Sequence, residues 1–122
     1  MNPMGANLKG DKQLLRDVAE LQKKIIEAGG DAVEAWGEDV KGTAQNRVPI
    51  DSGNLGSAIE SRPDRKRLKC DVGVWEEDAY YAEFVEQGTQ SMYAQPFLVP
   101  AFEQHADVTP YAKGALAKRL DS

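Results

Sequence analysis

The chain has 122 residues, of which 41% are hydrophobic and 29% charged, a composition typical of one soluble globular domain. It lacks an apolar run of the roughly 20 residues that a bilayer-spanning helix needs, so no membrane association is expected. The single cysteine excludes an internal disulfide, and the net charge of −5 disfavours a dedicated DNA-binding protein.

The N-terminal third is expected to be a helix that follows a short arm. Residues 1–10 form the flexible arm, and residues 11–122 form a single α+β domain. Asp11 is suited to the N-cap, because its carboxylate can accept hydrogen bonds from the free amides of the first turn. The apolar residues that follow recur at spacings of four and three, which places them on one face of an amphipathic helix: Leu14, Val18, Leu21, Ile25 and Ala28.

The glycine pair Gly29-Gly30 interrupts this pattern, and apolar residues continue the same face beyond it, at Ala32, Trp36 and Val40. One long helix bent at the glycines and two helices in series both fit the pattern. The helix is expected to end near Asn46 or Arg47, because Pro49 disfavours helical geometry at Val48. Residues 51–54 are Asp-Ser-Gly-Asn, which is strong turn chemistry.

Two β-strands are expected next, joined by a charged connection. Residues 57–62 form the first strand, and residues 68–74 alternate apolar and polar side chains as a second strand with one buried face. The two strands should pair as an antiparallel hairpin. Cys70 falls on the apolar face, where a small buried hydrophobe is favoured over a reactive thiol.

A short central helix and a C-terminal helix complete the chain. Residues 79–87 carry aromatic side chains four apart, and Gly88 stands where a left-handed C-cap is expected. Pro96 and Pro100 flank an apolar segment that is expected to be extended. A last helix follows, which Thr109-Pro110 can restart as N-cap and first helical residue.

Charged residues are segregated in the second half of the chain. A basic cluster lies at the predicted hairpin tip: Arg62, Arg65, Lys66, Arg67 and Lys69. Acidic residues then follow with no positive residue between them: Asp71, Glu76, Glu77, Asp78, Glu83 and Glu86. The two runs are either a solvated tip and helix face or surfaces by which neighbouring subunits match charges. Trp75, at the end of a strand, is expected at an edge or as an interface anchor.

Residues suited to catalysis, metal binding or cofactor binding are scarce. His105, the only histidine, is expected to be a helix residue half covered by its neighbours. The acidic run fits no EF-hand spacing and is better explained as solvated surface. The sequence has no Gly-x-Ser-x-Gly nucleophile elbow and no phosphate-binding glycine loop with its lysine. We therefore expect no enzymatic activity, no metal and no cofactor.

Three short motifs occur in a characteristic order. The first comprises Val48, Pro49, Asp51, Gly53 and Leu55, the second Tyr81, Ala82, Val85, Glu86, Gly88 and Thr89, and the third Pro96, Phe97, Leu98, Pro100 and Ala101. Together they resemble the family of siphophage neck and tail-completion proteins named after the tenth gene product of a lambdoid coliphage. Ser52 replaces the usual threonine of that family, and Pro110 interrupts a helix that usually runs on.

The resemblance implies an α+β fold with a long N-terminal helix, a small antiparallel β-hairpin sheet, a short central helix and a C-terminal helix packed on the sheet. It also implies a structural virion protein, made in the host cytoplasm, that forms or joins a ring between the DNA-filled capsid and the tail. Its partners would be copies of itself, other connector and tail proteins and, in passing, genome DNA. A tail terminator and a DNA-contacting accessory protein, which would use the hairpin tip, are the alternatives.

The motif residues are expected to be structural. Those of the first motif end the long helix and direct the chain into the sheet. Gly88 stops the short helix, and Glu86 beside Thr89 bonds the loop that follows. Phe97 and Leu98 are either core residues or a plug inserted into an adjacent subunit.

Overall fold

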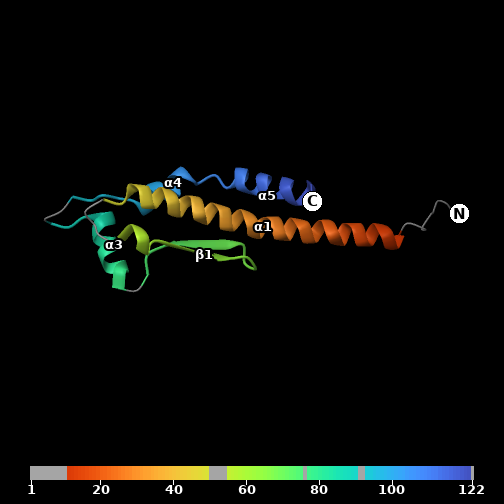
Figure 1. Ribbon diagram of the computed structural model, residues 1–122, viewed down its shortest axis with the longest axis horizontal. Helices are drawn as coiled ribbons and strands as arrows, with labels where there is room; N and C mark the ends of the chain where they lie inside the picture. Colours follow the sequence, from red (N-terminus) through yellow and green to blue (C-terminus); the bar gives the residue numbers. More distant parts are fainter. Residues whose placement is uncertain (1–10, 50–54, 76, 91–92, 122) are drawn as a thin grey trace.

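The computed structural model describes residues 11–49, 55–75, 77–90 and 93–121. In chain order its elements are α1 (Asp11–Arg47), α2 (Leu55–Ala58), β1 (Glu60–Asp64), β2 (Lys69–Gly73), α3 (Glu77–Gln87), α4 (Leu98–Gln104) and α5 (Thr109–Asp121). The long helix α1 is the axis of the molecule, with the hairpin along one side and α4 and α5 along another (Figure 1). The expected α+β class is confirmed. The predictions for residues 1–10, Asp51, Gly53 and Glu76 lie outside the described residues.

The helix α1 runs unbroken through Gly29-Gly30, which decides between the two alternatives in favour of one long helix. Its glycines allow the hairpin to approach the helix backbone. A Cβ atom at Gly29 would lie 3.1 Å from a methyl group of Leu68, and one at Gly37 would overlap the side chains of Cys70 and Ser61. Close packing against the hairpin therefore outweighs the low helix propensity of glycine.

Gly37→Ala is expected to lower the free energy of unfolding by about 1–2 kcal/mol, because overpacking against Cys70 and Ser61 exceeds the gain in helix propensity. Gly42→Ala is the matched control on the same helix, since a Cβ atom there meets nothing within 4 Å. This control should gain up to about 1 kcal/mol. Urea unfolding followed by circular dichroism measures both changes, and equal shifts of the same sign would contradict the close approach.

The hairpin is a two-stranded antiparallel sheet in which Glu60 pairs with Gly73 and Asp64 with Lys69. Residues 65–68 form the turn, and the Asp64 carboxylate accepts hydrogen bonds from the amides of the second and third turn residues at 3.1 Å each. Leu68 closes the turn with a φ of 52°, in the left-handed region. The turn is therefore stabilised by the Asp64 carboxylate and by Leu68, whose side chain lies against α1 at Gly29.

The first strand begins later than the sequence pattern predicts. Residues 57–58 belong to α2, a single helical turn, and not to β1. Leu55 at the start of this turn is buried in the core, and Gln45 of α1 donates a hydrogen bond to the Gly56 carbonyl at 3.1 Å. These two contacts hold the chain in a helical turn as far as Ala58, two residues before it enters the sheet at Glu60.

The core lies where the C-terminal half of α1 meets α2, the hairpin, α3 and α4. Its buried residues are Val40, Ala44, Leu55, Ile59, Val72, Ala82, Val85, Phe97 and Ala101. Phe97 is the largest fully buried side chain. Trp36 and Phe102 pack beside this cluster with their ring centroids 5.8 Å apart. The first half of α1 takes no part in it.

The C-terminal half differs from the expectation in two ways. Leu98 and Val99 begin α4, so the segment between the two prolines is helical and not extended. α5 begins at Thr109, one residue before the predicted first helical residue Pro110, and it packs on α1 and not on the sheet. Tyr111 and Arg119 explain this placement, since both bind carboxylates of α1.

Candidate assembly interface

The second and third motifs meet at Glu86, near the end of α3. One carboxylate oxygen accepts hydrogen bonds from the amides of Phe97 and Leu98 at 3.0 and 2.8 Å, and the other from Val99 at 3.1 Å. Amides in the first turn of a helix have no partner within the helix, and their dipoles favour a negative charge. Glu86 therefore caps α4 across the intervening loop, which is why α4 is helical from Leu98.

Gly88 adopts a φ of 79°, which confirms the predicted left-handed C-cap of α3. Its amide donates to the Phe84 carbonyl at 2.7 Å, and the Gln95 amide donates to the Val85 carbonyl at 2.8 Å. Both ends of the loop after α3 are thus fixed to α3 itself. Together with the Glu86 cap, these bonds make the second and third motifs one structural unit.

The apolar motif residues are divided between the core and the surface. Phe97 is buried within its own chain, with Leu98 half-buried against the same core. Those positions correspond to the core alternative and not to a plug that leaves its subunit. Of the other motif residues, those buried are Leu55, Ala82, Val85 and Ala101, those half-buried include Val48, Pro49 and Pro100, and those exposed are Tyr81, Thr89 and Pro96.

Arg65 at the hairpin tip is bound to α1. Its guanidinium lies 2.9 Å from the Asp31 carboxylate and 2.8 Å from that of Glu34, and it donates to the Glu27 carbonyl at 3.1 Å. Arg119 of α5 binds the other Asp31 oxygen at 2.7 Å. Asp31 thus ties the hairpin tip and α5 to one turn of α1, and Arg65 serves at least this intramolecular role.

The ion pairs with Arg119 and Arg65 lower the pKa of the Asp31 carboxyl. The hydrogen bonds from Arg119 and then Arg65 lower the pKa of Asp31 from 3.8 to about 2. A carboxyl whose pKa is lower in the folded state contributes stability above its unfolded pKa, and that contribution is lost as the pH falls through the folded pKa.

Wild type is therefore expected to lose about 1 kcal/mol of its advantage in unfolding free energy over Asp31→Asn when the pH is lowered from 6 to 2. This figure is reduced for solvent screening, because the Asp31 side chain is about one-third exposed. Urea unfolding at the two pH values measures it. Asp71→Asn, at an exposed position of β2, is the control and should show a smaller change. A pH-independent difference for Asp31→Asn would contradict the assigned ion pairs.

The rest of the basic tip is open to solvent. Lys66, Arg67 and Lys69 are exposed, with Arg67 only loosely paired to Asp64 at 3.8 Å. Arg62 lies over the Trp75 ring, 3.9 Å from its centroid, in a cation–π contact. Arg62 also pairs with the Glu60 carboxylate at 3.1 Å, so the solvent-exposed positive charge of the tip is concentrated on Lys66, Arg67 and Lys69.

The acidic helix α3 lies at the opposite end of the hairpin from this tip (Figure 1). Its exposed surface carries Asp78 and Glu83 together with aromatic rings. Tyr80 is 73% exposed, and its ring centroid lies 5.8 Å from that of the exposed Phe84. The sequence pattern did not identify this aromatic surface. The side chain of Glu77 lies outside the described residues.

His105 follows α4 and occupies a hydrogen-bonded chain. Its ring nitrogens lie 2.7 Å from the Thr43 hydroxyl and 3.0 Å from that of Tyr111, which in turn donates to Asp39 at 2.7 Å. Burial and the hydrogen bond to Asp39 raise the pKa of Tyr111 to about 12. Both ring nitrogens are engaged, so His105 joins α1, α4 and α5.

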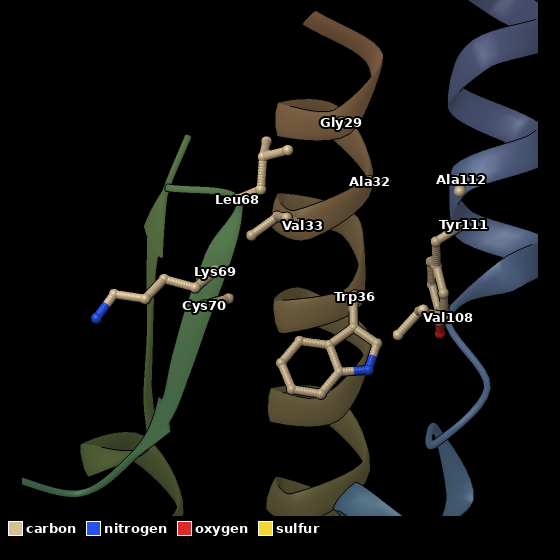
Figure 2. Close-up of a pocket in the computed structure, with 10 residues that line it drawn as sticks. All are labelled: Gly29, Ala32, Val33, Trp36, Leu68, Lys69, Cys70, Val108, Tyr111 and Ala112. Atoms are coloured by element: carbon tan, nitrogen blue, oxygen red, sulfur yellow. The ribbon is translucent and has the colours of Figure 1, made fainter. Parts of the chain in front are cut away.

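An apolar groove of about 370 Å³ lies on α1 between the hairpin tip and the start of α5 (Figure 2). Its lining includes Ala32, Val33, Trp36, Leu68, Val108 and Tyr111. Across the four described ranges, no three histidine, cysteine or acidic side chains are grouped to hold a metal ion. None of the helices in those ranges has the length and hydropathy to cross a bilayer.

The protein is a small α+β domain in which the hairpin packs on one side of a long helix and α4 and α5 pack on another. Basic residues lie at the tip of the hairpin, and the acidic helix α3 lies at its other end (Figure 1). Residues 12–88 match the family described as "Bacteriophage HK97-gp10, putative tail-component", and the chain belongs to this family. The match includes the first motif and the second motif as far as Gly88, and it covers more than half of the chain, so the resemblance seen in the sequence is confirmed. No curated protein and no solved structure matches the chain.

Proposed function

We propose that this phage tail component is a structural, non-enzymatic adaptor of the head–tail junction, in the neck or tail-completion position. It forms or joins a ring that connects the DNA-filled capsid to the tail. The observation that carries the proposal is the family match over residues 12–88. Its partners are copies of itself and the neighbouring connector and tail proteins, and it needs no cofactor.

The separation of charge along the hairpin supports a head-to-tail contact between copies. The basic tip and acidic α3 lie at opposite ends of the hairpin (Figure 1). Subunits related by rotation can therefore place Lys66 and Arg67 of one copy beside Asp78 and Glu83 of the next, and such heterologous contacts close into rings. The exposed aromatic pair on α3 adds apolar surface to that contact.

Phage that receive the double variant Lys66→Glu with Arg67→Glu are expected to accumulate filled heads and free tails that do not join. Arg65 is left unchanged, because its loss would also loosen the hairpin from α1. The measurement is complementation of a phage that lacks this gene, with particles counted by electron microscopy.

The matched control is Lys113→Glu with Lys118→Glu, an equal charge reversal at exposed positions of α5. It should leave joining intact. Normal joining and infectivity of the tip variant would show that the basic tip is only solvated surface.

A DNA contact through Lys66, Arg67 and Lys69 is the second candidate, because these exposed cations are adjacent. A dedicated DNA site would show an affinity for duplex DNA that falls steeply as the salt concentration rises. A plot of the logarithm of the binding constant against the logarithm of the salt concentration would have a slope of about −0.9 for each phosphate contacted. The adaptor role predicts no such affinity at physiological salt. A tail terminator is the remaining alternative, and the position of the protein along the particle separates it from the neck.

A further inference from the structure

The first half of α1 carries an apolar stripe with no partner among the described residues. α1 extends beyond the hairpin and α5 (Figure 1), and residues 11–22 are all exposed. Leu14, Val18, Leu21 and Ile25 lie on one face of this projection and are between 46% and 62% exposed. An aligned aliphatic stripe of this kind is typical of an interaction surface.

The spacing of the stripe is that of a coiled coil. Val18 and Ile25 are seven apart, as are Leu14 and Leu21, and the four alternate at intervals of four, three and four. In heptad terms the two β-branched residues occupy a positions and the two leucines d positions, and apolar a and d residues form the seam along which helices of a coiled coil pack. Because the described residues contain one such helix, a second copy can supply the other.

We propose that two copies pair through these projections as a two-stranded antiparallel coiled coil. Val18 of each copy packs level with Leu21 of the other, and Leu14 packs level with Ile25. The stripe is self-complementary in this register, so a two-fold axis relates the copies and the interface closes on itself.

Charge determines the orientation. Asp17 and Lys24 flank the stripe at the heptad g positions, and Leu15 and Gln22 flank it at the e positions. In an antiparallel pair, the g positions of one helix face the g positions of the other. Asp17 of each copy therefore lies beside Lys24 of the other copy, which gives two such pairs in one dimer. In a parallel pair g faces e, and Asp17 would meet Gln22. Only the antiparallel arrangement pairs opposite charges.

The body of the molecule sets the length of the overlap. The face of α1 is covered from Ala28 onward, where Arg65 and Arg119 bind the adjacent turn. The proposed register places Asp11 of one copy level with Ala28 of the other, an overlap of about 27 Å at 1.5 Å per residue. The two bodies then lie at opposite ends of the coiled coil and do not collide.

This pairing does not depend on the proposed function, since the dimer can form in solution outside any particle. The test is sedimentation equilibrium of the full-length protein at micromolar concentrations. Wild type should be a dimer, and Leu21→Glu should raise the dissociation constant by about 100-fold, because a carboxylate would be buried unpaired in the apolar layers. Ala19→Glu, exposed on the opposite face of the same helix, is the matched control and should remain a dimer.

Charge reversal tests the orientation separately. Asp17→Lys alone should weaken the dimer, and adding Lys24→Asp in the same chain should restore it, since the reversed pair again meets across the antiparallel interface. Far-ultraviolet circular dichroism and the urea midpoint verify that the body of each variant is folded. A monomeric wild type, a Leu21→Glu variant that still dimerises, or no restoration by the double reversal would overturn the proposal.

Discussion

Replacing Phe97 with alanine is expected to lower the free energy of unfolding by about 3–5 kcal/mol, the usual cost of truncating a buried phenylalanine. Phe97 is fully buried among core residues contributed by α1, the hairpin and α3. Truncation would leave a cavity where these elements meet. Urea or thermal unfolding of the purified variant measures the loss.

Tyr93→Ala is the control for this change, because Tyr93 is an aromatic residue of the adjoining loop that is 92% exposed. Its effect should stay within about 0.5 kcal/mol. If Phe97→Ala were equally mild, the ring would not be a core residue in solution. The alternative that Phe97 leaves its subunit to fill a neighbour would then be restored.

Replacing Glu86 with alanine is expected to cost about 2–4 kcal/mol, because three amides at the start of α4 lose their charged acceptor. Glu86→Gln keeps one acceptor oxygen and should lose about half as much. The variants are compared by urea unfolding, with helix content followed by circular dichroism.

Glu83→Ala, exposed one turn earlier on α3, removes an equal charge without removing a cap. It should change stability by no more than about 0.5 kcal/mol. Equal losses at the two positions would mean that the net charge of α3, and not the capping geometry, is responsible.

Helices and strands were predicted well from the sequence where their formation depends on residues close to one another in the chain. Apolar residues spaced four and three apart predicted α1, the alternating residues predicted β2, and Gly88 predicted the end of α3. Gly29-Gly30 was ambiguous for a physical reason, since glycine both weakens a helix and admits a close neighbour. Only the position of Leu68 against α1 shows which effect applies.

Contacts between residues that are far apart in the sequence could not be predicted from local patterns. Asp31 binds Arg65 and Arg119, which are 34 and 88 residues away, and no local pattern connects them. The cap from Glu86 to Leu98 crosses a loop, so the segment between two prolines appeared extended in isolation. The placement of α5 on α1 likewise depends on Tyr111 and Arg119, whose partners are remote in sequence.

The candidate interface was predicted in part. The charge runs located the basic tip, and the structure places α3 at the other end of the hairpin (Figure 1). Arg65 and Lys66 are neighbouring basic residues of the same turn, and the sequence alone does not show that Arg65 binds the carboxylates of Asp31 and Glu34 in α1. The apolar face of α1 was predicted as a helix face, and its exposure became evident only when the body proved too short to cover it.

The most direct test of the head–tail role is a cryo-electron microscopy reconstruction of the phage particle that carries this protein. The expected result is a ring of copies between the capsid vertex and the tail tube, with the hairpin tip of each subunit next to α3 of its neighbour. Density for this chain only at the distal end of the tail, or particles that join and infect without it, would contradict the head–tail role.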